Sequence, residues 1–236
     1  MKNLKLSVVI PAYNEEKNIK NTLTLLNEYL KKNFSDYEII VINDGSTDKT
    51  EEIIRELGFA RLFSEEKNRG KGYAVKKGIL NARGDCIFFT DADLSYSPEY
   101  IKLAAELMQK EKTDCICGKR FNLQNDYPPL RRLLSKTFQN MVSAFLKLEV
   151  KDTQCGFKGF SKKAAETVFP FVKTNGFGFD FEALYYARLF GFSASEISVR
   201  FSHSEKSHVR IFKDSADMLF SLLKIKFRSV SFEKNI

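Results

Sequence analysis

The 236-residue sequence lacks any hydrophobic run long enough to cross a membrane. A spanning helix needs about 20 consecutive apolar residues, so we expect none. Cysteine is scarce as well, and four residues are too few for the disulfide framework of a secreted scaffold. An apolar strand begins almost at the N-terminus, so we expect no signal peptide. These absences predict a cytoplasmic protein whose cysteines are mostly buried thiols.

Two common nucleotide-binding patterns are missing. The sequence has no G-x-x-x-x-G-K-[ST] phosphate loop and no G-x-G-x-x-G after its first expected strand. Both patterns bring backbone N–H groups to phosphates, so a P-loop enzyme and a dinucleotide-dependent oxidoreductase are disfavoured. Basic residues are abundant, with a net charge of +8, which favours an anionic partner. They are dispersed and form no recognition motif, so we expect no nucleic acid.

Strand and helix patterns alternate along the first half of the chain. Expected strands cover Leu6–Ile10, Glu38–Ile42, about Ala60 to Phe63 and Cys86–Phe89, with helical patterns between them. A further strand is expected at Asp114–Gly118. This alternation predicts an α/β fold with a mostly parallel, doubly wound sheet and helices on both faces.

Two carboxylates one residue apart, Asp91 and Asp93, follow the expected strand Cys86–Phe89. Ligands of open α/β sheets bind outside the carboxyl ends of the strands, and carboxylates suit Mg²⁺ or Mn²⁺. Taken alone, the pair could also simply shape a turn before the helix that Ser97 and Pro98 open.

Loops after the other expected strands carry groups suited to a nucleotide. Tyr13 offers an aromatic face, and Glu15 and Asp44 can accept hydrogen bonds from a base or ribose. The Gly70-Lys71-Gly72 segment allows backbone and a cation to approach phosphate. Each signal is weak alone, because such loops are common on protein surfaces.

Three motifs in this order, Val8 to Glu15, Asn43 to Asp48 and Asp91 to Asp93, resemble family 2 glycosyltransferases with the GT-A fold. The resemblance implies that Asp91 and Asp93 bridge a divalent metal to the donor diphosphate. Asn43 stands where many relatives have Asp, a change that keeps hydrogen bonding. The expected donor-binding residues are Pro11, Ala12, Tyr13, Glu15, Asn43, Asp44, Lys71, Asp91, Ala92 and Asp93.

Segments Asp152 to Phe160, Gly176 to Glu182 and Glu196 to Val209 are similar to the dolichyl-phosphate glucosyltransferase and mannosyltransferase branch, the glucosyl type more closely. This resemblance implies inverting transfer of a hexose to a dolichyl or other polyprenyl phosphate. UDP-glucose is the expected donor, GDP-mannose the second choice. Extension of a cell-surface glycan by a family 2 enzyme is the alternative, and a nucleotide-sugar-binding regulator is disfavoured by the intact carboxylates.

Phosphate-binding and catalytic residues complete the predicted site. Arg131 and Arg132 lie where a helix N-terminus disfavours positive charge, which indicates an external anion or, equally, an ordinary basic surface. The residues expected to contact donor or acceptor phosphate are Arg120, Arg131, Arg132, Arg200, Lys206 and His208. Asp93 and Asp180 are the catalytic candidates. Asp180 matches the catalytic carboxylate of inverting relatives, but an acceptor phosphate with a second pKa of about 6 is already largely ionised, so a structural role is equally open.

The C-terminal part has two expected helices, Leu130–Leu148 and about Ile211 to Arg228. The apolar residues at helical spacing are Leu130, Leu134, Phe138, Met141, Phe145 and Leu148 in the first, and Phe212, Ala216, Leu219, Phe220, Leu223 and Phe227 in the second. We divide the chain into a GT-A domain over residues 1–210 and a helix with a tail over 211–236. The apolar side of the last helix suits either the core or an anionic membrane surface. With a lipid substrate, we expect peripheral binding at the cytoplasmic face of a membrane.

Overall fold

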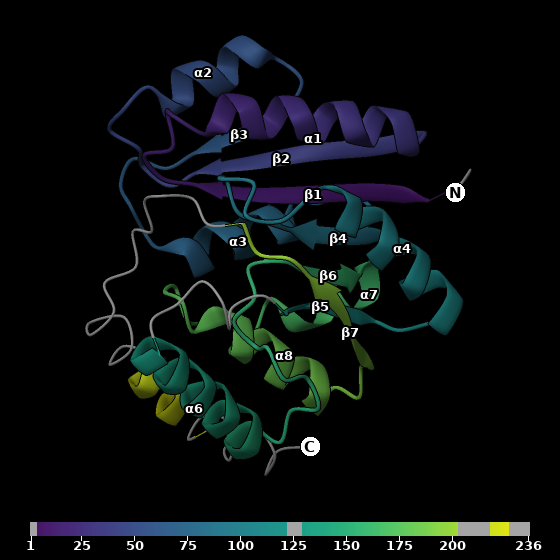
Figure 1. Ribbon diagram of the computed structural model, residues 1–236. Helices are drawn as coiled ribbons and strands as arrows, with labels where there is room; N and C mark the ends of the chain where they lie inside the picture. The colour runs from purple at the N-terminus through teal and green to yellow at the C-terminus, as the bar shows by residue number, and fades with distance from the viewer. Residues whose placement is uncertain (1–3, 122–128, 203–217, 227–236) are drawn as a thin grey trace.

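A seven-stranded mixed sheet forms the centre of the computed structural model, which describes residues 4–121, 129–202 and 218–226. The strand order is β3-β2-β1-β4-β6-β5-β7 (Figure 1). The strands are β1 (Lys5–Ala12), β2 (Asp36–Asn43), β3 (Arg61–Ser64), β4 (Cys86–Phe89), β5 (Cys115–Arg120), β6 (Lys158–Ser161) and β7 (Ala194–Val199). The helices are α1 (Ile19–Asn33), α2 (Thr50–Leu57), α3 (Lys71–Leu80), α4 (Glu99–Glu111), α6 (Pro129–Leu146), α7 (Lys162–Val168) and α8 (Phe179–Leu189).

Strand pairing is parallel except around β6. Strand β1 lies between β2 and β4 and is parallel to both, and β5 is parallel to β7. Strand β6 runs antiparallel to both of its neighbours, β4 and β5. The chain moves outward from β1 to β3 and returns to β4 on the other side of β1, which creates the switch point where such sheets bind ligands. The predicted mostly parallel α/β sheet is confirmed.

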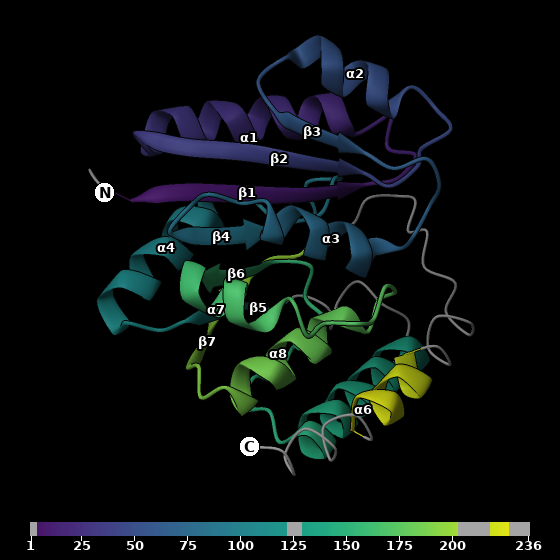
Figure 2. The ribbon, with the colours of Figure 1, turned by 180° about the vertical axis from the view of Figure 1, so that it is seen from behind.

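Helices cover both faces of the sheet, as predicted (Figures 1 and 2). Successive strand residues point to opposite faces, so Val8 belongs to the core beneath α1 and α4, whereas Val9 belongs to the core beneath α3, α7 and α8. Both side chains are fully buried. Because the central strands are apolar on both faces, they need a helix layer on each side.

A further layer forms where α6 and the helical residues 218–226 pack on α8 (Figure 1). The buried contacts between them are made by Val142, Leu146, Phe181, Tyr185, Leu222 and Ile225. The predicted helix Leu130–Leu148 is therefore present as α6. Of the expected helix from Ile211 to Arg228, residues 218–226 are helical, and the remainder lies outside the described residues. No helix in the described ranges is both long and apolar enough to span a bilayer.

Candidate active site

The loops that follow β1, β2 and β4 meet at one edge of the sheet, because parallel strands end at the same side. Strand β6 is antiparallel, so its first residue, and not its last, lies at this edge. Lys158 pairs in register with Phe89, the last residue of β4. The edge therefore collects side chains from both halves of the chain.

Asp91 and Lys71, both predicted to bind the donor, lie in direct contact. The Lys71 ammonium donates to Asp91 Oδ1 at 2.5 Å, and each side chain is 24% exposed. Burial disfavours the Lys71 cation, yet Asp91 and Asp180 favour it more strongly, so the pKa of Lys71 is raised. A fixed positive charge thus stands beside the first carboxylate of the Asp-Ala-Asp motif.

Asp93 shapes the turn that carries it. Its Oδ1 accepts hydrogen bonds from the backbone N–H of Ser95 at 3.0 Å and from the Ser95 hydroxyl at 2.6 Å. The carbonyl of Ala92 accepts a 2.7 Å hydrogen bond from the Thr22 hydroxyl of α1. The turn is therefore held from both sides. Asp93 stabilises this turn, which is the role that the alternative interpretation of the motif gave it.

The two carboxylates fit a divalent metal that also binds a ligand phosphate. Mg²⁺ in such sites uses one or two carboxylates and takes its other ligands from phosphates and water. Within residues 4–121, 129–202 and 218–226, no group of three or more His, Cys, Asp or Glu side chains is placed to enclose a metal. Asp91 and Asp93 match a site in which the protein supplies two carboxylates and the phosphates and water supply the other ligands.

Asp180 lies in the first turn of α8, beside a lysine that the sequence analysis did not single out. Lys158 Nζ donates to Asp180 Oδ1 at 2.9 Å and to the carbonyl oxygen of Cys155 at 2.5 Å. Burial raises the pKa of Asp180, and the Lys158 and Lys71 cations oppose that rise only in part. A carboxylate with a raised pKa is a stronger base, so this environment suits proton transfer.

Gly156 is a second residue that the sequence analysis missed. A Cβ atom there would lie 2.2 Å from Asp91 Oδ2, so the carboxylate rests directly on the backbone of this residue. Its amide N–H donates to the Tyr96 hydroxyl at 3.2 Å. A sequence signal existed for Lys158, since a lysine inside an apolar strand pattern indicates a paired, buried charge. No sequence signal marked Gly156, because its contact with Asp91 joins segments far apart in the chain.

The residues expected to hold the nucleoside organise the neighbouring loops. Asp44 is buried and accepts the backbone N–H groups of Arg69 at 2.9 Å and Gly70 at 2.8 Å. Burial raises the pKa of the Asp44 carboxyl. Asn43 donates to Glu51 at 2.8 Å and accepts the Ser46 N–H at 3.1 Å. Both side chains thus link the β2 loop to its surroundings.

The β1 loop presents the remaining predicted donor residues. Pro11 and Ala12 close β1 opposite Ile42 and Asn43 of β2. The Tyr13 side chain is 40% exposed, as a stacking platform requires. These positions bring the predicted donor residues to one edge of the sheet.

Arg120, predicted to contact phosphate, is paired with a carboxylate. Its Nε and Nη2 donate to the two oxygens of Asp152 at 2.7 Å each, and its backbone N–H donates to Asp152 Oδ2 at 3.1 Å. Both partners are largely buried. This bidentate pair holds the guanidinium against Asp152 and gives Arg120 a structural role, while its contact with phosphate stays a prediction.

The other predicted phosphate ligands are placed only in part. Arg200 directly follows β7 and is exposed, and its backbone N–H donates to the Tyr100 hydroxyl at 2.8 Å. Arg131 and Arg132 belong to the first turns of α6, and their side chains lie outside the described part of the structure. Lys206 and His208 lie outside the described residues altogether.

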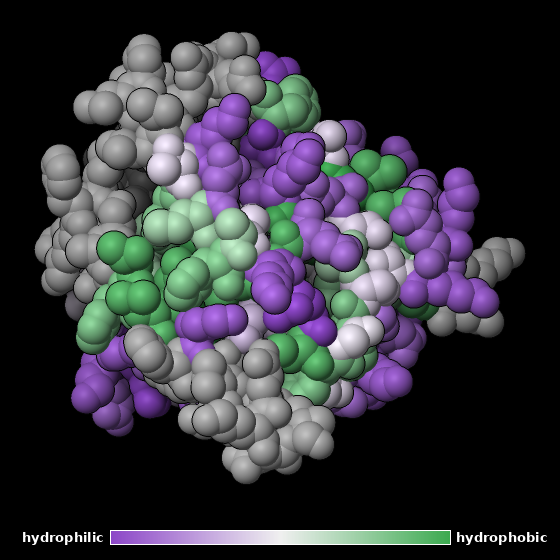
Figure 3. Space-filling model, turned by 90° about the horizontal axis from the view of Figure 1, so that it is seen from below, coloured by the Kyte–Doolittle hydropathy of each residue, from purple (hydrophilic) through white to green (hydrophobic). Residues whose placement is uncertain are grey.

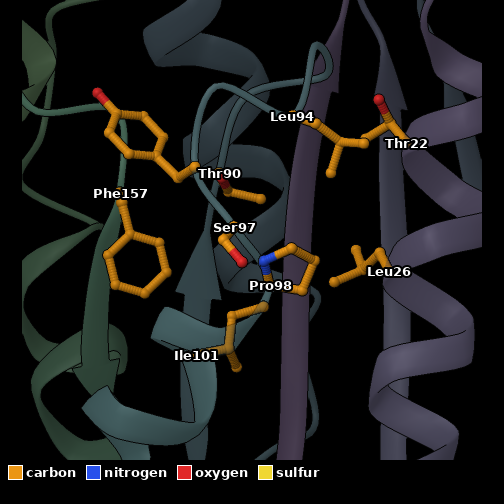
Figure 4. Close-up of a pocket in the computed structure, with 9 residues that line it drawn as sticks. Thr22, Leu26, Thr90, Leu94, Ser97, Pro98, Ile101 and Phe157 are labelled. Carbon is orange, nitrogen blue, oxygen red and sulfur yellow. The ribbon is translucent and has the colours of Figure 1, made fainter. Parts of the chain in front are cut away.

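A small cavity lies beside the Asp91–Asp93 turn, between it and residues of α1 and α4 (Figure 4). It is lined by Thr22, Leu26, Thr90, Leu94, Tyr96, Ser97, Pro98, Ile101 and Phe157. The Thr90 hydroxyl is buried and has no hydrogen-bond partner among the described residues. The mostly apolar lining does not suit a nucleotide diphosphate, so this cavity is a feature of the packing beside this turn.

Comparison with known proteins identifies the family. The model of the family described as "Glycosyl transferase family 2" matches residues 7–169. The dolichyl-phosphate beta-glucosyltransferase of Dictyostelium discoideum is 35% identical, over 96% of this chain and 75% of the relative. The enzyme of the same name from Drosophila melanogaster is 36% identical, over 89% of this chain and 71% of the relative. The human enzyme of this name is 33% identical, over 95% of this chain and 75% of the relative.

Solved structures share the fold. Glucosyl-3-phosphoglycerate synthase from Mycobacterium tuberculosis, in complex with Mg²⁺ and UDP, superposes with a TM-score of 0.74 at 22% identity, covering 94% of this chain and 79% of that one. The same enzyme with Mn²⁺, UDP and glucosyl-3-phosphoglycerate gives a TM-score of 0.71 at 22% identity, covering 94% and 80%. The GT-A-type architecture is thus confirmed. The family match over residues 7–169 and the relatives at 33–36% identity show that this chain belongs to glycosyl transferase family 2.

Proposed function

We propose that this chain transfers a glucosyl group from UDP-glucose to dolichyl phosphate or a related polyprenyl phosphate. The observation that carries the proposal is the convergence of the Asp91–Lys71 and Asp180–Lys158 pairs at the carboxyl edge of the sheet. The names of relatives with 33–36% identity over most of the chain support the same chemistry.

On the donor side, Asp91 and Asp93 would hold Mg²⁺ or Mn²⁺, which would neutralise charge on the leaving diphosphate. Lys71 adds a protein cation beside Asp91. The exposed Tyr13 would stack on the base, while Glu15 and Asp44 would accept hydrogen bonds from the nucleoside. A carboxylate has about four acceptor sites, so Asp44 can bind a nucleoside while it holds the Arg69–Gly70 backbone.

On the acceptor side, the attacking group is a phosphate oxygen. A phosphate monoester has a second pKa of about 6, so Asp180 would take the remaining proton from a singly ionised acceptor or orient an acceptor already ionised. Arg200, Arg131, Arg132, Lys206 and His208 stay candidates for binding donor or acceptor phosphate. Attack from the face opposite the leaving diphosphate would invert the anomeric carbon.

The donor and acceptor are tested by product analysis. Purified protein with Mn²⁺ should convert UDP-glucose and dolichyl phosphate to a lipid-linked monosaccharide, and Asp93→Ala should abolish this. UDP-sugars should raise the melting temperature more than GDP-sugars, since ligands stabilise the state that binds them. Extension of a glycan without lipid product, or a product formed only from GDP-mannose, would overturn the proposal.

We also propose that α6 and residues 218–226 lie on the anionic cytoplasmic face of a membrane. The sequence analysis placed Leu219, Phe220 and Leu223 on one side of the last helix, and these side chains are 42–59% exposed while Leu222 and Ile225 face the core. Met141 and Phe145 of α6 are 38% and 40% exposed. Seen from below, apolar residues gather over these helices among polar ones (Figure 3). Lys224 lies 4.3 Å above the Phe220 ring, so charge and apolar surface are combined.

Vesicle binding tests this surface. Each Lys or Arg near an anionic bilayer contributes about 1 kcal/mol, so binding should weaken with salt and when Lys224, Lys226 and Arg228 become Glu. The exposed α1 residues Lys31 and Lys32, changed to Glu together, provide the control. Activity toward a short, water-soluble acceptor should survive. Binding that depends on neither salt nor these residues would exclude the proposed surface.

A further inference from the structure

The Lys158 side chain is fully buried, with no exposed surface. Lysine is almost never fully buried unless it is paired, because removal of its charge from water is costly. The ammonium is paired here with Asp180 and also binds the Cys155 carbonyl. Burial disfavours the cation, but Asp180 outweighs it and the pKa of Lys158 is raised, so the lysine stays charged.

This lysine connects two parts of the site that are distant in sequence. Through the Cys155 carbonyl it holds the turn whose next residue, Gly156, rests on the Asp91 carboxylate. Through Asp180 it holds the first turn of α8. The metal-binding carboxylate and the candidate base are therefore positioned by one buried side chain.

Among the charged side chains near Asp180, Lys158 is the one that contacts its carboxylate directly. Lys71 and Asp91 act on Asp180 through charge, with opposite signs. On the lysine side, Asp152 acts through charge and is itself bound to Arg120. The Cys117 and Cys155 thiols lie close by, and the Phe89 ring centre is 5.7 Å from Nζ. Neither the thiols nor the ring can replace an ammonium group as the counter-ion of a carboxylate.

We propose that Lys158 is a positioning residue that binds Asp180 and the Cys155–Gly156 turn together and so fixes the place of Asp180 relative to Asp91. The proposal rests on the proposed function, in which Asp180 faces the acceptor phosphate. If the lysine served folding alone, replacing it would change only the amount of folded enzyme. If it is a positioning residue, replacing it would also change the pH dependence of kcat per folded molecule.

The test compares Lys158→Gln, Lys158→Met and wild type at saturating Mn²⁺ and UDP-glucose. The Gln amide can still donate to Cys155 or Asp180, so this variant is expected to fold even if the Met variant does not. Without the cation, the acidic limb of the kcat profile should move up by about one pH unit or more. At pH 7 kcat should fall at least about tenfold, while the KM for UDP-glucose stays within about twofold.

Lys76→Met is the matched control, because Lys76 Nζ also donates to backbone carbonyls, those of Pro170 and Val172, away from the site. It should leave the pH profile unchanged. Combining Lys158→Gln with Asp180→Asn should cost no more than Asp180→Asn alone, because coupled residues are not additive. An unshifted acidic limb, or additive losses, would overturn the positioning role. Failure of wild type to form lipid-linked glucose would instead overturn the proposed function.

Discussion

Asp152 and Asp180 are both buried carboxylates paired with a basic residue, yet their environments differ. Asp152 accepts two side-chain hydrogen bonds and one backbone hydrogen bond from Arg120, and a further one from Gln139 at 3.2 Å. Burial opposes its ionisation, but Arg120 outweighs this and lowers the pKa of Asp152. At Asp180 burial prevails and raises the pKa, despite Lys158 and Lys71.

Under the proposed function, the difference separates a structural carboxylate, Asp152, from a reactive one, Asp180. A bidentate arginine satisfies both oxygens and locks their geometry, which leaves little capacity for a substrate. The lysine at Asp180 is a compact charge that contacts one oxygen. We therefore expect Asp152 to determine stability and Asp180 to determine rate.

Among the changes that test this comparison, the largest effect is expected from Asp180→Asn. If Asp180 moves a proton or orients the acceptor, kcat per folded molecule should fall about 10²–10⁴-fold. Steady-state kinetics normalised to the folded fraction, with UDP-glucose binding measured separately, would check this. Near-normal kcat would make Asp180 a structural residue like Asp152 and erase the contrast.

Asp152→Asn should act on stability. Removal of one partner from a buried ion pair costs about 3–5 kcal/mol, because Arg120 keeps its charge without a counter-ion. Urea unfolding should show this loss, with kcat of the remaining folded enzyme within about threefold of wild type. A large loss of kcat at unchanged stability would place Asp152 in the reaction.

Gly156→Ala tests the turn that, through Lys158, connects Asp180 to Asp91. The added Cβ would lie 2.2 Å from Asp91 Oδ2, so the carboxylate must move, and a displacement of about 1 Å can cost 10²-fold in rate. Gly176→Ala is the control, since a Cβ there meets nothing within 4 Å. Equal kcat in both variants would show that Asp91 tolerates displacement.

The pH dependence of unfolding should have opposite signs at the two sites. The folded pKa of Asp152 is below its ordinary value of 3.8, so its stabilisation is complete above that value and is lost as the pH falls through the folded pKa. The folded pKa of Asp180 is above 3.8, so its burial penalty is relieved on acidification through that pKa. Each unit of pKa difference corresponds to about 1.4 kcal/mol. Denaturation of wild type and both Asn variants across acidic pH measures these slopes, and parallel curves would contradict the assignment.

The smallest effect concerns Thr90, a buried polar residue near the site without an ionic partner. Its hydroxyl has no hydrogen-bond partner in the described part of the chain, and an unpaired buried hydroxyl is costly. Thr90→Val should therefore raise the free energy of unfolding by up to about 1 kcal/mol. Thr113→Val is the matched control, because the equally buried Thr113 donates to Cys115 and accepts from Ser195, and it should lose stability. A loss in both variants would reveal an unrecognised contact of Thr90.

Local pattern was sufficient wherever the site follows a parallel strand. Apolar runs followed by Tyr13, Asp44 and Asp91 predicted three strands and the sheet edge at which these residues meet, since parallel strands end at the same edge. The family and the GT-A-type fold were also predicted and are confirmed. The helix α6 was predicted, but its buried face was not: Val142 and Leu146 are buried, whereas Met141 and Phe145 of the expected apolar stripe are exposed.

The sequence by itself determined the alternation of strands and helices, the edge where the predicted donor residues lie and the Asp91–Asp93 pair, because these depend on neighbours in the chain. Only the tertiary structure decided which charges are paired. The antiparallel insertion of β6 brings Lys158 to Asp180 and Gly156 to Asp91, and it leaves Arg120 bound to Asp152. Which charge finds which partner depends on distances between segments far apart in sequence, and no local pattern encodes those distances.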